Sequence, residues 1–544
     1  MRPLRIRRAE DALEPVGDGK SAAAGGGMVS TASPHATAAG VRVLAAGGNA
    51  VDAAVAAALA LGVAEPQASG LGGQGSAILH LAGRTVTLDG SSRAPSLAHI
   101  GSFGKGERSN GYRAATIPGT PALLGYMHLR YGRLPWADVV EPSIRLARDG
   151  YEVTSLQHAL QERERPNFER VPSGSGARYF LNGGKPYAVG ARFVQKDLAA
   201  LHETLASEGF KAFYHGEVAD TIDKDMRANG GFLRKDDLAQ VPWPVERPAL
   251  ERRYRRLKVV TLPPPAAGRT LLLVLMMLTQ VHAKVIREQG TAAYHRMAET
   301  FRKALLTRVE RPFDPATYPQ FGMPTIRWSA AKRMAASIGE RVDPALPRAE
   351  PPLEAADTTH LSVMDRDGNA VGLTQSIERV YGSRAAADGL GFLYNNYMLA
   401  YDTSNPAHPY YLRPGAVPWS SVAPSLVFHK ERLWMVMGSP GSERIPPTLA
   451  QFLSHIVDRG LSVDAAMRAP RLHCSIAGRL SLEADRFDPA VVDGLAGLGY
   501  EIDRREPYAF YLGAVHAVVR RAYGDGFQGV AEVRRDGTAA GPAD

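Results

Sequence analysis

The residues that most directly suggest chemistry are Asp357-Thr358-Thr359-His360, which open a segment with strand character. A threonine hydroxyl is a weak nucleophile unless a base lies beside it. A threonine at a free N-terminus carries its own base, because its α-amine has a pKa of about 7.7 to 8.0. A break before Thr358 would therefore give one residue both roles. Taken alone, the Thr-Thr-His triplet is more typical of an ordinary strand start, so the surrounding elements must decide.

The chain after Thr358 is predicted to form a sheet covered by helices. A turn at Asp367-Gly368-Asn369 separates two strand-like stretches and predicts a hairpin. A second pair of strands and two helices follow it. In order, the predicted strands are 359–364, 370–375, 426–428 and 433–437, and the predicted helices are 447–459 and 463–468. Strands that face helices imply an α/β protein with a layered sandwich.

The chain before Thr358 also begins with strands and helices. The predicted elements are a strand at 28–31, helices at 34–46 and 50–61, and a hairpin of 77–81 with 84–89. From 120 to about 278 the pattern is mainly helical, with the clearest helices at 135–148, 195–208 and 270–281. The region from 311 to 352 is rich in proline and charge, which predicts a surface-exposed approach to Thr358.

One glycine-rich run, Gly70-Leu71-Gly72-Gly73-Gln74-Gly75, formally matches the fingerprint of dinucleotide-binding proteins. That fingerprint requires a strand before it and a helix after it, so that a phosphate meets the helix N-terminus. Here a helix precedes the glycines and a strand follows them. The run therefore predicts a tight turn or a close approach of two backbones, not a cofactor site.

Composition excludes several classes of protein. Apolar residues make up 45% and charged residues 22% of the 544 residues, which is typical of a soluble globular protein. The net charge of +9 is mostly diffuse, which argues against nucleic-acid binding. Its densest run, Arg2, Arg5, Arg7 and Arg8, precedes a Gly/Ala-rich stretch, so residues 1–27 are expected to form a flexible lead-in.

The remaining features predict a cytoplasmic protein without a metal, a cofactor or a membrane anchor. Cys474 is the only cysteine, which excludes an internal disulfide, and His473 beside it is too little for a zinc site. The longest apolar runs, 53–64 and 271–278, are much shorter than the roughly 20 residues that cross a bilayer. No apolar segment of a secretory signal follows the basic N-terminus.

Several short segments, in a specific order, resemble the gamma-glutamyltranspeptidase family. Each is an ordinary turn or helix start on its own, but their joint order is specific. Before Thr358 they are Gly47-Gly48-Asn49-Ala50-Val51-Asp52-Ala53-Ala54, Leu71-Gly72-Gly73, Pro118-Gly119-Thr120, Leu146-Ala147-Arg148-Asp149-Gly150 and Pro263-Pro264-Pro265. After it they are Asp367-Gly368-Asn369-Ala370-Val371, Asn395-Asn396, Gly438-Ser439-Pro440-Gly441 and Ala469-Pro470-Arg471.

This resemblance implies the fold and the organisation of the chain. The family has the four-layer αββα sandwich of N-terminal nucleophile hydrolases, so the same α/β architecture is expected here. The precursor is expected to cut itself between Asp357 and Thr358 into a large subunit, 28–357 behind the lead-in, and a small catalytic subunit, 358–544. The two subunits would remain partners in one intertwined domain. Whether this heterodimer forms larger homo-oligomers is an alternative that the sequence does not decide.

The resemblance also assigns roles to the residues around Thr358. In the family's manner, the Thr358 hydroxyl attacks the Asp357 carbonyl, and water then releases the ester. Ser376 stands where the family has a threonine whose hydroxyl orients the nucleophile, and serine keeps that hydroxyl. The backbone N–H groups of Gly441 and Ser442 would form the oxyanion hole. The family has a second glycine at the latter position, so Ser442 must adopt the required backbone dihedrals.

The substrate pocket departs from the family pattern. Family members hold the α-carboxylate of a gamma-glutamyl group with an arginine and a serine pair, and its α-ammonium with Asn, Gln and Asp. Only the serine pair is matched here, by Ser420 and Ser421. The arginine position is Ser91, and the ammonium positions are Glu378, Tyr397 and Ala400. Arg93 offers compensation for the carboxylate, since in an extended segment it faces the same side as Ser91, about 6.6 Å along.

These features lead to a first hypothesis and three alternatives. The first is a threonine hydrolase or acyltransferase that acts on a small acyl or amide substrate with altered specificity. The alternatives are an ordinary gamma-glutamyltransferase or glutathione hydrolase, a carbon–carbon bond hydrolase of the kind found in alkylproline-type antibiotic biosynthesis, and an inactive relative that acts as a binding protein. The Pro- and Tyr-rich segment 402–417 would be a lid over the substrate or a plain surface connection.

Overall fold

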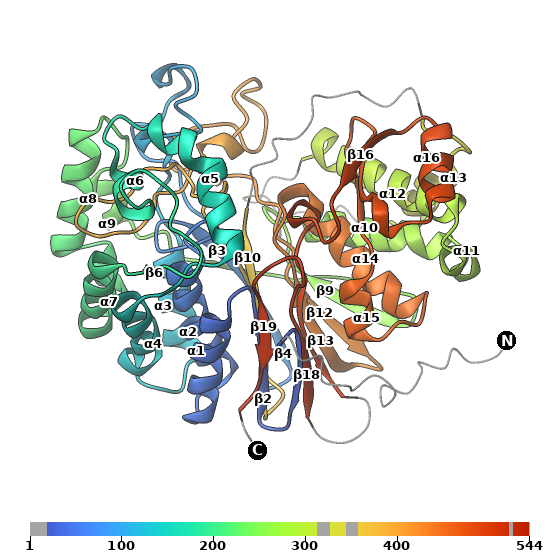
Figure 1. Ribbon diagram of the computed structural model, residues 1–544, viewed down its shortest axis with the longest axis horizontal. Helices are drawn as coiled ribbons and strands as arrows, with labels where there is room; N and C mark the ends of the chain where they lie inside the picture. Colours follow the sequence, from blue (N-terminus) through green and yellow to red (C-terminus); the bar gives the residue numbers. More distant parts are fainter. Residues whose placement is uncertain (1–18, 313–326, 344–356, 522–525, 543–544) are drawn as a thin grey trace.

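Two antiparallel sheets pack face to face, with a layer of helices on each outer side (Figure 1). The computed structural model describes residues 19–312, 327–343, 357–521 and 526–542. Apolar residues of the two inner sheet faces, such as Ile78, Leu426 and Val436, form the core between the sheets. Two larger cores join each sheet to its own helices. The four-layer αββα sandwich is therefore confirmed.

The sheet that carries Thr358 has the order β19-β2-β10-β11-β3-β4-β7. In that order its strands are Thr538–Ala540, Gly27–Thr31, Thr359–Asp365, Ala370–Ser376, Gln74–Leu81, Arg84–Gly90 and Val245–Arg247. The predicted hairpins β3–β4 and β10–β11 are both present. Because β10 and β11 lie between β2 and β3, strands from both sides of Thr358 share one sheet, as expected of an intertwined domain.

The second sheet has the order β1-β18-β17-β13-β12-β9-β8. Its strands are Ser21–Ala24, Phe527–Val530, His516–Arg520, Arg432–Gly438, Ser425–His429, Leu257–Thr261 and Leu250–Tyr254. The predicted hairpin of 426–428 with 433–437 is confirmed as β12–β13. Smaller sheets pair β5 Tyr151–Glu152 with β6 Arg192–Phe193, and β14 Leu472–Cys474 with β15 Arg479–Glu483 and β16 Glu501–Arg505.

Two predictions about the strands of these sheets were wrong. Residues 245–261 lie in the region expected to be mainly helical, yet they form β7, β8 and β9. In β8 only Leu250 and Tyr254 are buried, and the charged residues between them gave the strand no apolar pattern. Residues 21–24 were expected to belong to the flexible lead-in, but they form β1 because their backbone pairs with β18. The rest of the lead-in, 1–18, lies outside the described residues.

The helices fall into two groups. Beside the Thr358 sheet lie α1 Pro34–Ala45, α2 Ala50–Ala64, α3 Thr120–Tyr131, α4 Trp136–Asp149, α5 Ser155–Glu169, α6 Ser175–Phe180, α7 Lys196–Glu208, α8 Gly216–Ala228 and α9 Lys235–Ala239 (Figure 1). Beside the other sheet lie α10 Gly268–Gln280, α11 Ala283–Glu288, α12 Thr291–Glu310, α13 Trp328–Ala336, α14 Ile445–Val457, α15 Val463–Arg468 and α16 Pro489–Gly497. Of the predicted surface-exposed approach at 311–352, residues 313–326 and 344–352 lie outside the described residues.

The start of α2 explains the Gly-Gly-Asn-Ala-Val-Asp segment. The Asn49 side chain accepts hydrogen bonds from the N–H groups of Val51 and Asp52, and the Asp52 carboxylate accepts one from the Asn49 N–H. This capping box satisfies N–H groups that the helix itself cannot pair. A carboxylate of β10, Asp365, accepts the Ala50 N–H at 2.9 Å, which ties the helix to the strand that follows Thr358.

The glycine run before β3 makes the close backbone approach that the sequence predicts. A side chain on Gly72 would come within 2.0 Å of the Leu393 carbonyl oxygen, and one on Gly73 within 2.3 Å of the Ser376 carbonyl oxygen. Glycine is required at these two positions because neighbouring backbone fills the space. The glycine run therefore packs directly against the backbone at the end of β11, where Ser376 lies.

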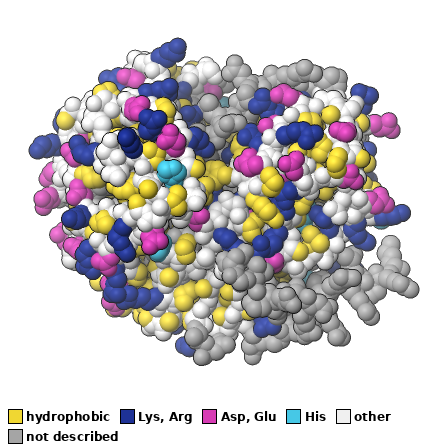
Figure 2. Space-filling model, viewed as in Figure 1, with side chains coloured by type: hydrophobic (Ala, Val, Ile, Leu, Met, Phe, Trp, Pro, Cys, Tyr) yellow, Lys and Arg dark blue, Asp and Glu magenta, His cyan; other side chains and the backbone are white. Residues whose placement is uncertain are grey.

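Charge is dispersed over the visible surface. Lysine and arginine side chains alternate with aspartate and glutamate on the face shown in Figure 2, without a continuous basic stripe. Within the described ranges, no helix is both long and apolar enough to cross a bilayer. The same residues contain no group of three or more His, Cys, Asp and Glu side chains placed to hold a metal. Cys474 is a buried free thiol.

Candidate active site

The hairpin β10–β11 brings Thr358 and Ser376 together. Thr358 immediately precedes β10, and Ser376 is the last residue of β11. The antiparallel register pairs Thr359 with Gln375, so the next residues outward face each other across the strands. Their hydroxyl oxygens are 3.3 Å apart. The predicted nucleophile and its predicted orienting hydroxyl are thus direct neighbours.

Both hydroxyls contact the carbonyl of the peptide bond between Asp357 and Thr358. The Thr358 hydroxyl donates to the Asp357 carbonyl oxygen at 2.7 Å, and the Ser376 hydroxyl donates to the same oxygen at 2.8 Å. The Glu378 N–H in turn donates to Ser376 Oγ at 2.8 Å, which orients that hydroxyl. Two donors on one carbonyl oxygen polarise the carbonyl and stabilise negative charge on it.

The side chain of Asp357 is anchored by a residue that sequence reasoning missed. Arg535 donates to both carboxylate oxygens of Asp357, at 2.6 and 3.2 Å, and all these groups are buried. Glu65 lies 3.8 Å from the same guanidinium and accepts a hydrogen bond from the Thr359 hydroxyl at 2.6 Å. Burial raises the pKa of Glu65 to about 8, although the charge of Arg535 opposes this. No local pattern signals these partners, since both lie far from Thr358 in sequence.

The residues predicted to form the oxyanion hole lie in the turn between β13 and α14. Gly441 has φ of +125° and Ser442 has φ of +53°, so the serine adopts a left-handed backbone where the family has a glycine. Non-glycine residues seldom adopt it. Within the described part of the chain, neither N–H group donates to a protein acceptor. Two backbone donors are therefore available at this turn.

A cavity of about 400 Å³ opens beside Thr358. Among the residues predicted to act on or bind substrate, Thr358, Ser442, Glu378, Tyr397, Ser420 and Ser421 line it. Gly441 lies next to the wall rather than in it. The segment 402–417, expected as a lid or a surface connection, contributes Asp402 and His408 to the wall. The structure thus brings most of the predicted site residues around one cavity.

Arg93 lies outside the cavity lining, and its predicted role in holding a substrate carboxylate was wrong. Its guanidinium turns back to donate to the carbonyl oxygens of Ser91 and Ser92, at 2.8 and 3.1 Å. It does not line the cavity. Ser91 is likewise engaged elsewhere, because its hydroxyl donates to Asp89 at 2.5 Å. The long arginine side chain folds onto its own backbone instead of pointing into the cavity.

Arg308, at the end of α12, supplies the positive charge of the cavity wall. It donates to Ser421 Oγ at 3.2 Å and to the Ser420 carbonyl oxygen, and it lies 4.6 Å from the ring centre of Trp419. Burial lowers its pKa to about 10, so it remains a cation at neutral pH. Sequence reasoning missed Arg308 because it stands in a helix 50 residues before Thr358 without any distinguishing pattern.

Glu378 and Tyr397 occupy two of the positions where the family binds an ammonium. Burial raises the pKa of Glu378 to about 7, while Arg379 and Arg308 oppose the shift. Its backbone carbonyl accepts the Asp357 N–H at 3.0 Å, which links the cavity wall to the residue before Thr358. Burial and the nearby Glu378 raise the pKa of the Tyr397 hydroxyl, so it stays protonated.

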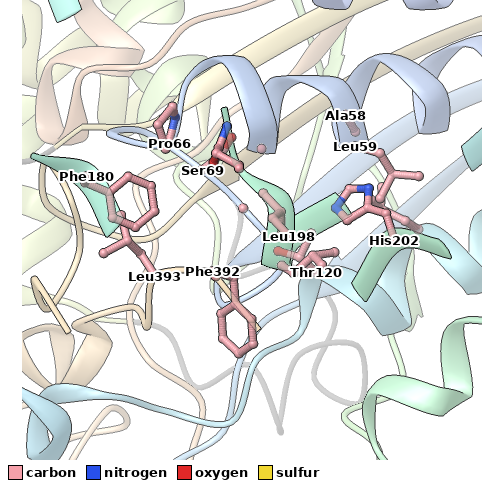
Figure 3. A pocket seen from close by; sticks show the side chains of 16 residues that line it. Ala58, Leu59, Pro66, Ser69, Thr120, Phe180, Leu198, His202, Phe392 and Leu393 are labelled. Atoms are coloured by element: carbon pink, nitrogen blue, oxygen red, sulfur yellow. The ribbon is translucent and has the colours of Figure 1, made fainter. Parts of the chain in front are cut away.

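A second cavity, shown in Figure 3, lies apart from this chemistry. It measures about 10 Å³ and is lined mainly by apolar residues, including Phe180, Leu198 and Phe392. Its one titratable group, His202, has a pKa lowered to about 4 by burial and lies 2.6 Å from the Ser143 hydroxyl. A volume of this size is at the limit of what holds a single water, so it is a packing gap.

Comparisons with known proteins agree with the geometry. The family model described as gamma-glutamyltranspeptidase matches residues 36–542. The chain is 33% identical over 548 residues to the Acylase ACY 1 proenzyme of Pseudomonas sp. (strain SE83), with 95% of this chain and 94% of that protein covered. It is 33% identical over 536 residues to the Glutathione hydrolase proenzyme of Escherichia coli (strain K12), with 93% and 89% covered.

A solved structure supports the same assignment. The cephalosporin acylase from Bacillus halodurans superimposes with a TM-score of 0.86 at 27% sequence identity, covering 96% of this chain and 97% of that chain. Both the family model and the relatives span nearly the whole chain. The protein is therefore an enzyme of the N-terminal threonine hydrolase type and belongs to the gamma-glutamyltranspeptidase family.

Proposed function

We propose that the chain cuts itself between Asp357 and Thr358 and then uses Thr358 to hydrolyse or transfer a small acyl group whose head group differs from that of glutamate. One observation carries the proposal most directly. The Thr358 hydroxyl and the Ser376 hydroxyl both donate to the Asp357 carbonyl oxygen, at the edge of a cavity that has room for a substrate. Attack by the first hydroxyl would be helped by the second.

In this arrangement, cleavage begins with transfer of the Asp357 acyl group from the Thr358 nitrogen to the Thr358 hydroxyl oxygen. Thr358 Oγ forms a bond to the Asp357 carbonyl carbon, and Ser376 Oγ stabilises the negative charge on the oxygen. The bond to the Thr358 nitrogen then breaks, and that nitrogen takes the proton given up by the hydroxyl. Water hydrolyses the resulting ester. The products would be residues 1–357 and 358–544, with a free α-amine on Thr358.

Turnover would use the same atoms in a second role. The freed α-amine takes the Thr358 hydroxyl proton as the oxygen attacks the substrate carbonyl carbon. The N–H groups of Gly441 and Ser442 hold the oxyanion. The amine leaving group departs with the proton from the Thr358 ammonium, which leaves an acyl-enzyme. Water or a second amine then accepts the acyl group.

Altered specificity is supported by the rebuilt end of the cavity. Tyr397 and Ala400 line it where the family places ammonium ligands, and the arginine expected near Ser91 is absent from it. An ordinary glutathione hydrolase is the second candidate, because Ser420 and Ser421 still face the cavity. Cleavage of a carbon–carbon bond would use the same nucleophile and oxyanion donors, so substrate tests must include it.

The intact mass of the purified protein under denaturing conditions tests the proposal. Wild type should give two fragments that meet between Asp357 and Thr358, whereas Thr358→Ala should stay whole. Gamma-glutamyl, oxalyl and simple acyl anilides, with an acyl ketone for the carbon–carbon reaction, would then identify the class of substrate. A wild-type chain that stays whole and is inert towards all of them would instead support an inactive relative with a binding role.

A further inference from the structure

Arg308 combines a fixed orientation with a charge that faces the cavity. It donates hydrogen bonds to Ser421 Oγ at 3.2 Å and to the Ser420 carbonyl oxygen. Its guanidinium lies against Trp419, whose ring stacks on Tyr410 with centroids 5.1 Å apart. These contacts hold the guanidinium in place before any ligand arrives. Less ordering free energy is then lost when a ligand binds.

The charge of Arg308 is not neutralised by a contact partner. Within the residues that the structure describes, no carboxylate forms an ion pair with it. The other acids of the wall, Asp402 and Glu443, form no ion pair with Arg308 in the described part of the chain, and Glu443 lies 3.4 Å from His473. Glu378 is held partly neutral at neutral pH, since burial raises its pKa to about 7. A half-buried cation in the cavity wall without a paired anion attracts negative charge, so an anionic ligand would be stabilised here.

The remaining hydrogen-bond capacity matches an oxyacid. A guanidinium has five N–H donors. The two hydrogen bonds to Ser421 and Ser420 leave the other N–H donors of Arg308 available to a ligand. Its planar edge suits the two oxygens of a carboxylate. Ser421 Oγ accepts from Arg308, so its own proton is available to a ligand oxygen. Ser421, Arg308 and Thr358 all line the same cavity.

We propose that Arg308 and the Ser421 hydroxyl bind an anionic group, a carboxylate, on the acyl portion of the substrate while Thr358 attacks its carbonyl. This inference rests on the proposed function and names its substrate class, an acyl group that carries an acid. Arg308 is then the specificity residue of the cavity. It takes the place that the sequence had suggested for Arg93.

Variants of Arg308 and Arg93, assayed with pairs of charged and uncharged substrates, test the proposed role of Arg308. Cleaved wild type, Arg308→Gln, Arg308→Lys and Arg93→Gln would be assayed with mono-anilides of dicarboxylic acids of three to six carbons. Each would be paired with the anilide of the monocarboxylic acid of the same length. Calorimetric binding of glutarate to the same four proteins gives a second readout that needs no turnover. Intact mass confirms that each variant has folded and matured.

Wild type should prefer the charged member of its best pair by about 30-fold or more in kcat/KM, mainly through KM. Arg308→Gln should lose this preference and the binding of glutarate. Arg308→Lys should keep part of it, because lysine retains the charge without the planar fork. Arg93→Gln should keep the preference.

Three results would overturn the assignment: a wild type without preference for charged acyl groups, equal glutarate binding by wild type and Arg308→Gln, or loss of preference only in Arg93→Gln. Failure of the proposed function looks different, as an uncut chain or as no turnover of any acyl substrate. Glutarate binding still decides the role of Arg308 in that case.

Discussion

The two ends of the cavity are assembled in different ways. At the nucleophile end, Thr358 and Ser376 come from adjacent strands of one hairpin, and their separation follows from the strand register. At the head-group end, Arg308 comes from α12, while Ser420 and Ser421 come from the segment before β12. The reacting groups are therefore fixed by hydrogen-bonded backbone. The recognition groups sit on separate elements, where a single substitution can change specificity without disturbing the chemistry.

The largest effect is expected from the anchor of the nucleophile end. Arg535→Met would leave the carboxylate of Asp357 buried without its cation. Loss of one partner of a buried pair costs about 3 to 5 kcal/mol. The free energy of unfolding, measured in urea in the uncut Thr358→Ala background, should fall by that amount, and self-cleavage should slow in an otherwise wild-type chain. Arg308→Gln, a substitution at the head-group end of the cavity, serves as the control for the free energy of unfolding. An Arg535→Met chain of unchanged stability would refute the anchoring role.

The oxyanion turn is the next most sensitive feature. Gly441→Val places a branched side chain at φ of +125°, which should displace the N–H group. The value of kcat should fall by about 10² to 10³, as for loss of one oxyanion donor. Ser442→Gly keeps the N–H and suits φ of +53°, so kcat should stay close to wild type. Equal kcat values for both variants in steady-state assays would argue against this turn as the oxyanion hole.

Ser376 should have a smaller effect, because it assists rather than attacks. Ser376→Ala removes one hydrogen bond to the Asp357 carbonyl and leaves the Thr358 hydroxyl in place. A loss of about 1 to 3 kcal/mol would slow self-cleavage by roughly 5- to 150-fold. Ser376→Thr, which retains the hydroxyl, should cleave at nearly the wild-type rate. The time course of fragment formation by mass spectrometry distinguishes these variants, and normal cleavage by Ser376→Ala would exclude the assistance.

The smallest expected effect concerns the head-group end. Burial raises the pKa of Glu378 to about 7, so below that pH the side chain is mainly neutral and above it mainly negative. A negative charge near Arg308 should weaken the binding of an acidic acyl group. KM for such a substrate should therefore rise severalfold as pH passes upward through about 7, and Glu378→Gln should remove this rise. A KM that rises equally in both proteins would assign the titration to another group.

The same contrast explains how far the sequence predicts the structure. Thr358, Ser376 and the hairpin between them are predicted correctly, because strand pairing acts over about 18 residues of chain. At Ser442 the family's glycine indicated only that the backbone dihedrals are constrained, and the structure gives a φ of +53°. Arg308 and Arg535 could not be found in this way, since only the folded chain brings them to the site. The error at Arg93 arose because strand alternation fixes the Cβ direction but not where a long side chain ends.

The central claim is that the nucleophile end is retained while the head-group end has changed. The most direct measurement is kcat/KM of the cleaved wild-type enzyme for a gamma-glutamyl anilide and for the corresponding glutaryl anilide. These two substrates differ only in the α-ammonium group. The account predicts turnover through Thr358 with the glutaryl compound at least as good a substrate. A tenfold or greater preference for the gamma-glutamyl compound would contradict it and identify an ordinary gamma-glutamyl enzyme.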